Sequence, residues 1–269
     1  MKKQKIAVIG GDLRQYYLVS LLRANGYQTA FYDVVNLQNH AALQDILDSN
    51  DLLILPYPLT KDGVNIHITC CEEKIPLETV ATGKPVFAGG NYKNFINYAK
   101  DPALIEANSA LTAEAAVSIA VENSEKSIFG SKILVIGYGN IGKLLADDLQ
   151  TMGGQVTVTV RDTKHLPALE KKGFHYIYME DLKDLFAYDM IFNTAPAPVL
   201  DASRLATCQN DVLIIDLASM PGGTDFSFAQ QNKIRALLAL SLPAKKSPKT
   251  AAQIIYNSVI NNIQREEKL

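Results

Sequence analysis

The 269-residue sequence is poor in the features of secreted, metal-binding or nucleic-acid-binding proteins. Its three cysteines, Cys70, Cys71 and Cys208, have no metal-ligand spacing, so we expect reduced thiols, a cytoplasmic protein and no bound metal. Two adjacent thiols also rarely point at one ion, which disfavours a site made by Cys70 and Cys71 with His67. The formal net charge of -2 gives no reason to expect a nucleic acid or a membrane as a partner. We recognise no signal peptide and no apolar run long enough to span a bilayer.

The apolar residues that are present form short β-branched runs that alternate with helical patterns, which is typical of parallel βαβ units. In the first part of the chain we predict strands over 5–10, 28–33, 51–55 and 85–88, and helices over 14–25, 41–48 and 76–82. In the second part we predict strands over 132–136, 155–160, 174–178, 189–193, 211–216 and 234–238. A helix is predicted over 166–172, and the first and last helices of this part over 110–121 and 250–267.

This pattern predicts an α/β protein with two Rossmann-like domains, parallel sheets and an inter-domain cleft. We expect a substrate domain over 1–109, a connecting helix over 110–127 and a dinucleotide-binding domain over 128–246. The C-terminal helix, 247–269, carries an amphipathic stripe and is expected to pack back on the first domain. The apolar helix over 110–121 suits a connector or a dimer surface, and a homodimer is the expected oligomer.

A glycine motif follows the strand over 132–136 and opens a helical pattern. It consists of Gly137, Tyr138, Gly139, Asn140, Ile141 and Gly142. The first glycine allows a tight turn, the second lets the backbone approach a pyrophosphate, and the third allows close packing of helix and strand. The alternative is a glycine turn without a ligand. We expect a dinucleotide on the positive end of this helix.

The next strand ends in Arg161, Asp162 and Lys164, where NAD-binding proteins usually carry an acid for the ribose hydroxyls. A guanidinium at this position suits a 2′-phosphate. The sequence therefore favours NADP, with NAD as the alternative because Asp162 is within reach of a ribose. Ligands of such sheets bind beyond the carboxyl ends of the strands, which predicts further cofactor contacts from Thr194, Ala195, Asp216, Leu217 and Ala218.

Three other segments carry candidate chemistry. The Pro-Gly-Gly turn with Gly222 and Gly223 offers backbone N–H groups to an anion, and Asp225 behind it either caps a helix or meets a substrate. Lys245 lies in a basic, proline-fixed loop that either attracts carboxylates or is a solvated surface. Arg14, at the start of a helix, is either exposed or close to an anion.

These segments bring the chain close to a known family. Gly11 to Gln15, the helix start at Thr112 to Ala115, the glycine motif, Asp216 to Phe226 and Leu242 to Ala251 together resemble the A subunit of dipicolinate synthase over nearly the whole chain. The resemblance implies a two-domain fold similar to formate/glycerate dehydrogenases. It further implies NADP-dependent oxidation of a dihydrodipicolinate-like ring to dipicolinate during sporulation, with a flavoprotein-like partner as the second subunit.

For that reaction we assign substrate binding to a set of polar and glycine residues, namely Arg14, Gln15, Asn91, Thr112, Gly222, Gly223 and Lys245. The ring proton needs a base, for which the candidates are Asp12, Glu114 and Asp225. Ala244 and Ala252 replace glycines of the family, which leaves open another small dicarboxylate as the substrate.

Two other functions stay open. A 2-hydroxyacid dehydrogenase would need a histidine after Asp216, and the four histidines of the chain all precede it. His165 and His175 fall in a peripheral helix and strand, which favours surface positions. The other alternative is a nucleotide-binding regulatory or scaffold subunit without turnover of its own.

Overall fold

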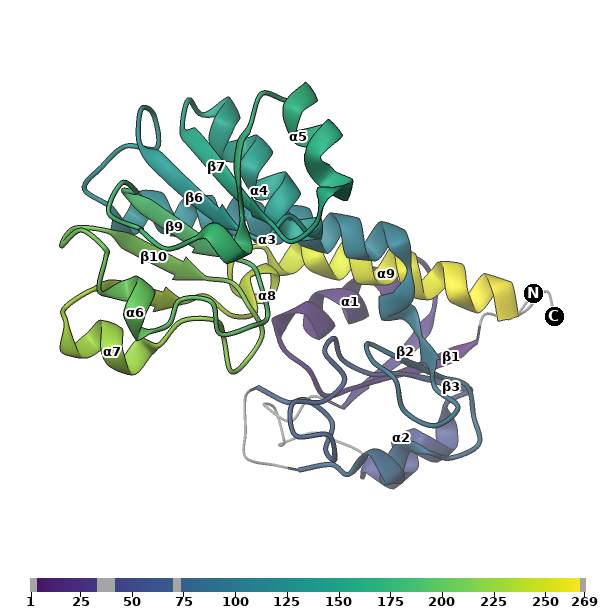
Figure 1. Ribbon diagram of the computed structural model, residues 1–269. Helices are drawn as coiled ribbons and strands as arrows, with labels where there is room; N and C mark the ends of the chain where they lie inside the picture. The colour runs from purple at the N-terminus through teal and green to yellow at the C-terminus, as the bar shows by residue number, and fades with distance from the viewer. Residues whose placement is uncertain (1–3, 33–41, 70–73, 267–269) are drawn as a thin grey trace. The chain divides into compact units, whose positions relative to one another are not determined.

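The structure, a computed structural model, describes residues 4–32, 42–69 and 74–266 (Figure 1). The chain forms two compact units, Met1–Asn108 with Ala244–Leu269 and Ser109–Pro243. Each is an α/β unit with one parallel sheet, which confirms the predicted fold class. Cys70 and Cys71 lie outside the described residues. Burial, together with the charge of Asp184, raises the pKa of the Cys208 thiol to about 11, so this thiol stays protonated.

The sheet of the first unit has the order β2-β1-β3-β4-β5, with every pair parallel. This is a doubly wound order in which the strand sequence reverses between β1 and β3. Its strands are β1 (Lys5–Ile9), β2 (Gln28–Tyr32), β3 (Leu52–Ile54), β4 (Val86–Ala88) and β5 (Ile96–Asn97). Its helices are α1 (Leu13–Ala24), α2 (Leu43–Ser49), η2 (Leu77–Val80), η3 (Tyr98–Lys100) and α9 (Pro248–Glu266).

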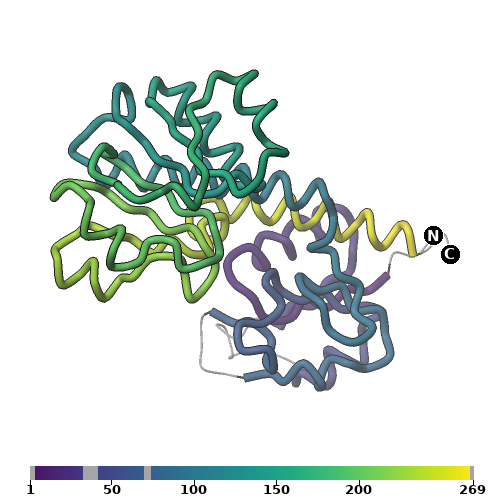
Figure 2. Tube along the Cα trace, in the orientation of Figure 1, coloured from purple at the N-terminus to yellow at the C-terminus, as the bar shows by residue number. Residues whose placement is uncertain are grey.

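Two helices from opposite ends of the chain cover one face of this sheet. Leu18 and Leu22 of α1 and Val259 of α9 are fully buried in one cluster with Ile6 and Val8 of β1. The C-terminal helix therefore packs on the first unit, beside α1 (Figure 2). On the other face, α2 contributes Ile46 and Leu47 to a separate core cluster.

The sheet of the second unit has the order β11-β10-β9-β6-β7-β8, again all parallel. This is the order of dinucleotide-binding domains, and its direction reverses between β6 and β9. Its strands are β6 (Lys132–Ile136), β7 (Gln155–Val160), β8 (His175–Tyr178), β9 (Met190–Asn193), β10 (Leu213–Asp216) and β11 (Arg235–Leu238). Between these strands run α4 (Asn140–Thr151), η4 (Thr163–His165), α5 (Leu166–Lys171), η5 (Met179–Asp181), α6 (Ala202–Leu205) and α7 (Phe226–Gln231).

Helix α3 (Pro102–Asn123) is longer than the predicted 110–121 and runs from the first unit into the second. Among the described helices, it alone has the length and mean hydropathy of a membrane span. Ala113, Ala116 and Ala120 are fully buried in the core of the second unit, while Glu114 is exposed. This split between a buried and a polar face is typical of a core helix of a globular unit.

One predicted loop is a helix. Lys245, expected in a proline-fixed loop, lies exposed in the last turn of α8 (Leu242–Lys246). Pro243 is the second residue of this helix, where its missing N–H is no loss because first-turn N–H groups have no intrahelical acceptor.

Candidate functional site

The glycine motif forms the loop between β6 and α4. Gly137 has φ 95°, a conformation that side chains rarely adopt. A Cβ on Gly142 would lie 2.2 Å from the carbonyl oxygen of Gly137, so the helix can approach the loop only with glycine there. A Cβ on Gly139 would meet nothing within 4 Å. The space in front of Gly139 is therefore open, while the other two glycines are needed by the loop itself.

The N-terminus of α4 has no side-chain cap. Its N-cap is Gly139, and among the described residues no side chain accepts a hydrogen bond there. The first intrahelical bond runs from Lys143 N–H to the Gly139 carbonyl, 3.0 Å. The N–H groups of Asn140, Ile141 and Gly142 precede this bond, so they are donors for an anion at the positive end of the helix.

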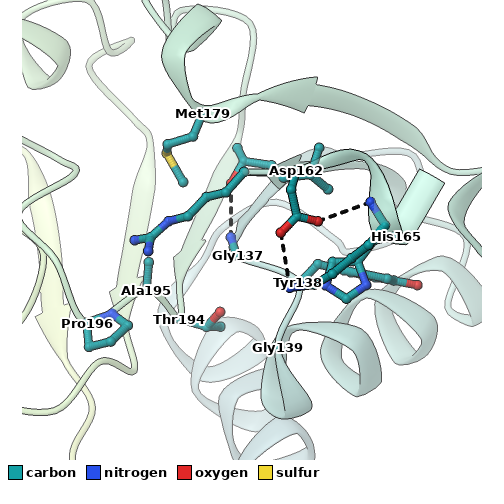
Figure 3. Close-up of a pocket in the computed structure, with 13 residues that line it drawn as sticks. Gly137, Tyr138, Gly139, Asp162, His165, Met179, Thr194, Ala195 and Pro196 are labelled. Carbon is teal, nitrogen blue, oxygen red and sulfur yellow. Dashed lines mark hydrogen bonds and ion pairs between the residues drawn. The ribbon is translucent and has the colours of Figure 1, made fainter.

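A pocket of about 230 Å³ lies beside this loop at the carboxyl ends of β6, β7 and β9 (Figure 3). Thr159 holds its inner wall by accepting a hydrogen bond from Gly137 N–H at 2.9 Å. Thr194 donates from Oγ1 to the Ile136 carbonyl at 2.9 Å. The pocket is lined by Gly137, Tyr138, Gly139, Thr159, Val160, Arg161, Asp162, Lys164, His165, Met179, Thr194, Ala195 and Pro196.

The charges of the pocket lie at the end of β7. Lys164 forms an ion pair with Asp162, 3.0 Å between Nζ and Oδ2, and its backbone N–H also donates to that carboxylate. The hydrogen bond from Lys164 lowers the pKa of Asp162. Arg161 forms no ion pair with any described residue, which leaves its guanidinium available to a ligand.

His165 lines the pocket, although the sequence favoured a surface position. Its ring meets the ring of Tyr138 edge-on, with centroids 5.5 Å apart (Figure 3). Met179 and Pro196 complete the wall and carry no motif of their own. The one signal that the sequence offered for His165 was its place directly after Lys164.

Asp216 does not lie on the pocket as expected. It is fully buried at the end of β10, and Leu217 and Ala218 are also buried. Its carboxylate accepts four hydrogen bonds within the second unit, from Asn193 Nδ2 at 2.9 Å, Ala218 N–H at 3.0 Å, Gly223 N–H at 2.8 Å and Thr224 Oγ1 at 2.7 Å. These donors replace the water lost on burial.

The Pro-Gly-Gly turn is consequently occupied by an internal anion. Gly223 N–H, predicted to be free for a ligand, binds Asp216, and Gly222 N–H donates to the Ser219 carbonyl at 2.9 Å. A Cβ on Gly223 would lie 2.3 Å from Asn193 Nδ2, so this glycine serves close packing. Asp225 caps α7 by accepting from Phe228 N–H at 2.9 Å, the capping alternative of the two considered.

A second cluster of polar residues lies in the first unit, where β1 meets α1. Asp12 caps α1 and forms a capping box with Gln15. Arg14 is buried and donates to Asp12 through Nε at 2.9 Å and Nη2 at 2.7 Å, and also to the Tyr57 carbonyl. Burial raises the pKa of Asp12, but the hydrogen bonds and charge of Arg14 outweigh it and lower the pKa overall. The anion that the position of Arg14 suggested is therefore Asp12.

The other predicted substrate residues have ordinary surroundings. Gln15 is fully buried, and its Nε2 has no hydrogen-bond partner among the described residues. Asn91 is exposed and accepts from Asn97 Nδ2 at 2.8 Å. Thr112 is buried in α3, whereas Glu114 on the same helix is exposed.

The strand order, the three glycines and the uncapped helix define a dinucleotide-binding oxidoreductase domain. A family model agrees: "D-isomer specific 2-hydroxyacid dehydrogenase, NAD binding domain" matches residues 104–219. A second model, for the N-terminal domain of the dipicolinate synthase A subunit, matches residues 5–105. The A subunit of dipicolinate synthase from Bacillus subtilis is 32% identical over 98% of each chain. The chain belongs to this family of dipicolinate synthase A subunits.

Solved structures agree with this assignment. The A subunit of dipicolinate synthase from Bacillus halodurans superposes with a TM-score of 0.85 at 26% identity, covering 97% of this chain and 98% of that one. The A chain from Bacillus subtilis gives a TM-score of 0.82 at 27% identity, covering 99% and 98%. D-Lactate dehydrogenase from Escherichia coli, 13% identical with a TM-score of 0.64 over 98% and 97%, shares the fold.

Proposed function

We propose that the protein oxidises a dihydrodipicolinate-like cyclic dicarboxylate to dipicolinate, with NADP as the hydride acceptor. The observation that carries this proposal is the 32% identity to the A subunit of a dipicolinate synthase over 98% of both chains. When bound, the nicotinamide takes up the hydride, and the protein supplies orientation and electrostatics. The ring loses a proton as it becomes aromatic.

The residues beside α4 fit such a cofactor. Open N–H groups at the helix start and free space at Gly139 suit a pyrophosphate. Arg161 is the proposed partner of the 2′-phosphate, since Asp162 is already engaged by Lys164 and competes less for the ribose. Thr194 and Ala195 line the same pocket and are proposed to complete the cofactor contacts.

The proton would pass to Glu114. Of the three candidate bases, Asp12 is held by Arg14 and Asp225 caps α7. Glu114 accepts no hydrogen bond from, and forms no ion pair with, the described residues, and it is exposed on α3. A carboxylate without such partners is the better proton acceptor because nothing else stabilises its charged form.

The substrate carboxylates would meet Arg14 and Gln15. Two of the three guanidinium nitrogens of Arg14 are engaged by Asp12 and Tyr57, and Nη1 has no described partner. The buried Nε2 of Gln15 is an unsatisfied donor, which a carboxylate oxygen or an ordered water would satisfy. We propose the remaining predicted substrate residues, Asn91, Thr112, Gly222, Gly223 and Lys245, as supporting positions only.

The assembly also belongs to this proposal. The relatives are named as one subunit of a synthase, which supports a flavoprotein-like partner as the second subunit. A homodimer of this chain and a cytoplasmic location complete it.

The test is a thermal unfolding titration of the purified chain with NADP, NAD and dipicolinate, separately and together. A ligand that binds only the native state raises the melting temperature by mass action. We expect stabilisation by NADP, a further shift with dipicolinate, and NADPH formation from dihydrodipicolinate. NADP stabilisation without a dipicolinate effect would assign a different small acid. No shift with either nucleotide would favour the scaffold function.

A further inference from the structure

His165 lies where a second positive charge of the pocket would be useful. It ends η4, directly after the turn that carries Arg161, Asp162 and Lys164, and all four residues line the pocket. The edge of its ring against Tyr138 fixes it between the glycine loop and η4 (Figure 3). Tyr138 is itself buried in the core of the second unit, so the imidazole is held on a rigid support.

The charges around the pocket do not balance a 2′-phosphate. Lys164 and Asp162 neutralise each other, which leaves the single charge of Arg161. A phosphate monoester carries close to two negative charges at neutral pH, with a second pKa of about 6. One positive charge is therefore missing.

The free protein holds His165 neutral. Burial lowers its pKa, and the charges of Lys143 from α4 and of Lys164 lower it further, while Asp162 acts in the opposite direction. Tyr138 from the glycine loop adds no charge at neutral pH, and Arg161 adds another positive one. A dianion placed among these groups reverses the balance and favours the charged imidazole.

We propose that His165 binds the 2′-phosphate of NADP as a cation and takes up a proton when NADP binds. This makes the preference for NADP over NAD depend on pH. The inference rests on the proposed NADP dependence and adds a specificity-determining residue to it. The adenosine ribose of NAD has no phosphate at this position, so NAD binding causes no such proton uptake.

Thermodynamic linkage gives the direction of the effect. A site that gains a proton on binding binds more tightly as the pH falls. Between pH 8 and pH 6.5 we expect the ratio of the NAD to the NADP dissociation constant to rise about five- to tenfold. Protonation of the phosphate itself would weaken NADP binding as the pH falls, so the two causes have opposite signs.

The experiment is calorimetric titration of the full chain with NADP and with NAD at pH 6.5 and pH 8, in two buffers of different ionisation enthalpy. We expect proton uptake with NADP only. His165→Gln should remove the uptake and flatten the pH dependence, leaving NAD affinity unchanged. His175→Gln is the matched control, because His175 is exposed on β8 and does not line the pocket.

Two results overturn the proposal and separate it from the proposed function. A preference for NADP that does not change with pH, or a normal pH profile in His165→Gln, would exclude His165 but keep NADP as the cofactor. An affinity for NADP no higher than for NAD at either pH would remove the proposed NADP dependence itself.

Discussion

The two units use the same strand–loop–helix motif in opposite ways. In the first unit, the helix after β1 begins at its own carboxylate, Asp12, whose charge is further matched by Arg14. In the second unit, the helix after β6 begins at Gly139, which has no side chain to offer. Both loops lie where the strand order of their sheet reverses, the usual position for a ligand. The helix start at β6 thus remains open to an external anion, and the one at β1 is filled internally.

The Pro-Gly-Gly turn follows the pattern of the first unit. Its Gly223 N–H is bound by the buried carboxylate of Asp216, which belongs to the strand just before it. Glycine-rich turns and helix starts are therefore not equivalent as ligand sites. A turn is available to a phosphate only when no carboxylate of the chain reaches it first.

The largest expected effect comes from breaking the internal pair. Arg14→Ala leaves the buried Asp12 carboxylate without its partner, and losing one member of a buried pair costs about 3–5 kcal/mol. We expect the free energy of unfolding, measured with urea, to fall by about 3 kcal/mol. NADP affinity should be unchanged, because the pair belongs to the first unit and the glycine loop to the second.

Arg23→Ala is the control on the same helix, since Arg23 is exposed and donates only to the Thr29 carbonyl. The loss in Arg14→Ala should also depend on pH. The pKa of Asp12 is lowered in the folded state, so its stabilising effect is present above the unfolded value of about 4 and is lost as the pH falls through the folded value. A loss of the same size at pH 3 and pH 7 would contradict an ionic cause.

Converting the open helix start into a filled one is the next test. Gly139→Asp places a carboxylate at the N-cap of α4, where it would occupy the first-turn N–H groups and repel a pyrophosphate. We expect NADP affinity to fall at least about 100-fold, or about 2.7 kcal/mol. The melting temperature of the ligand-free protein should stay level or rise slightly, because Asp is a slightly better N-cap than Gly.

Gly139→Ala separates charge from bulk, because its Cβ meets no protein atom within 4 Å. Its NADP affinity should lie between those of the unmodified chain and Gly139→Asp. Retention of full NADP affinity in Gly139→Asp would mean that α4 does not bind the phosphates.

The sequence predicted the open site better than the filled ones. The glycine spacing and Arg161 are local signals, and both lie on the pocket. The partners of Asp216 come from three separate stretches around residues 193, 218 and 223–224, which only the folded sheet brings together. Nothing in the periodicity of the chain reveals that a nearby carboxylate will bind a turn's N–H groups.

Strand order was likewise beyond the pattern. Both halves alternate strands and helices in the same way, yet β3 pairs directly with β1 in the first unit, whereas the third strand of the second unit, β8, lies at the edge beside β7. His165 was missed for a related reason. It follows a charged turn in the sequence, and only its contact with Tyr138 shows that it faces the pocket.

The internal anion of the Pro-Gly-Gly turn gives a smaller effect. Thr224→Val removes one of the four donors to the buried Asp216 carboxylate at nearly constant volume. A hydrogen bond to a charged group contributes about 1.5–3 kcal/mol, so we expect a loss of about 2 kcal/mol in chemical unfolding. Thr163→Val, at an exposed position, is the control. A rise in the KM for the substrate without loss of stability would instead support a ligand role for the turn.

The smallest effect concerns a third helix start. Asp225 caps α7, so Asp225→Ala should lower stability by about 1 kcal/mol and leave kcat unchanged. Glu114→Gln should behave in the opposite way, because its carboxylate has no described partner to lose, and a general base contributes about 10²–10⁴ to the rate. Measuring kcat and the free energy of unfolding for both variants separates the two roles. A large loss of kcat in Asp225→Ala with unchanged stability would show that a capping carboxylate can also serve as the base, and the contrast between filled and open helix starts would then no longer predict where the chemistry lies.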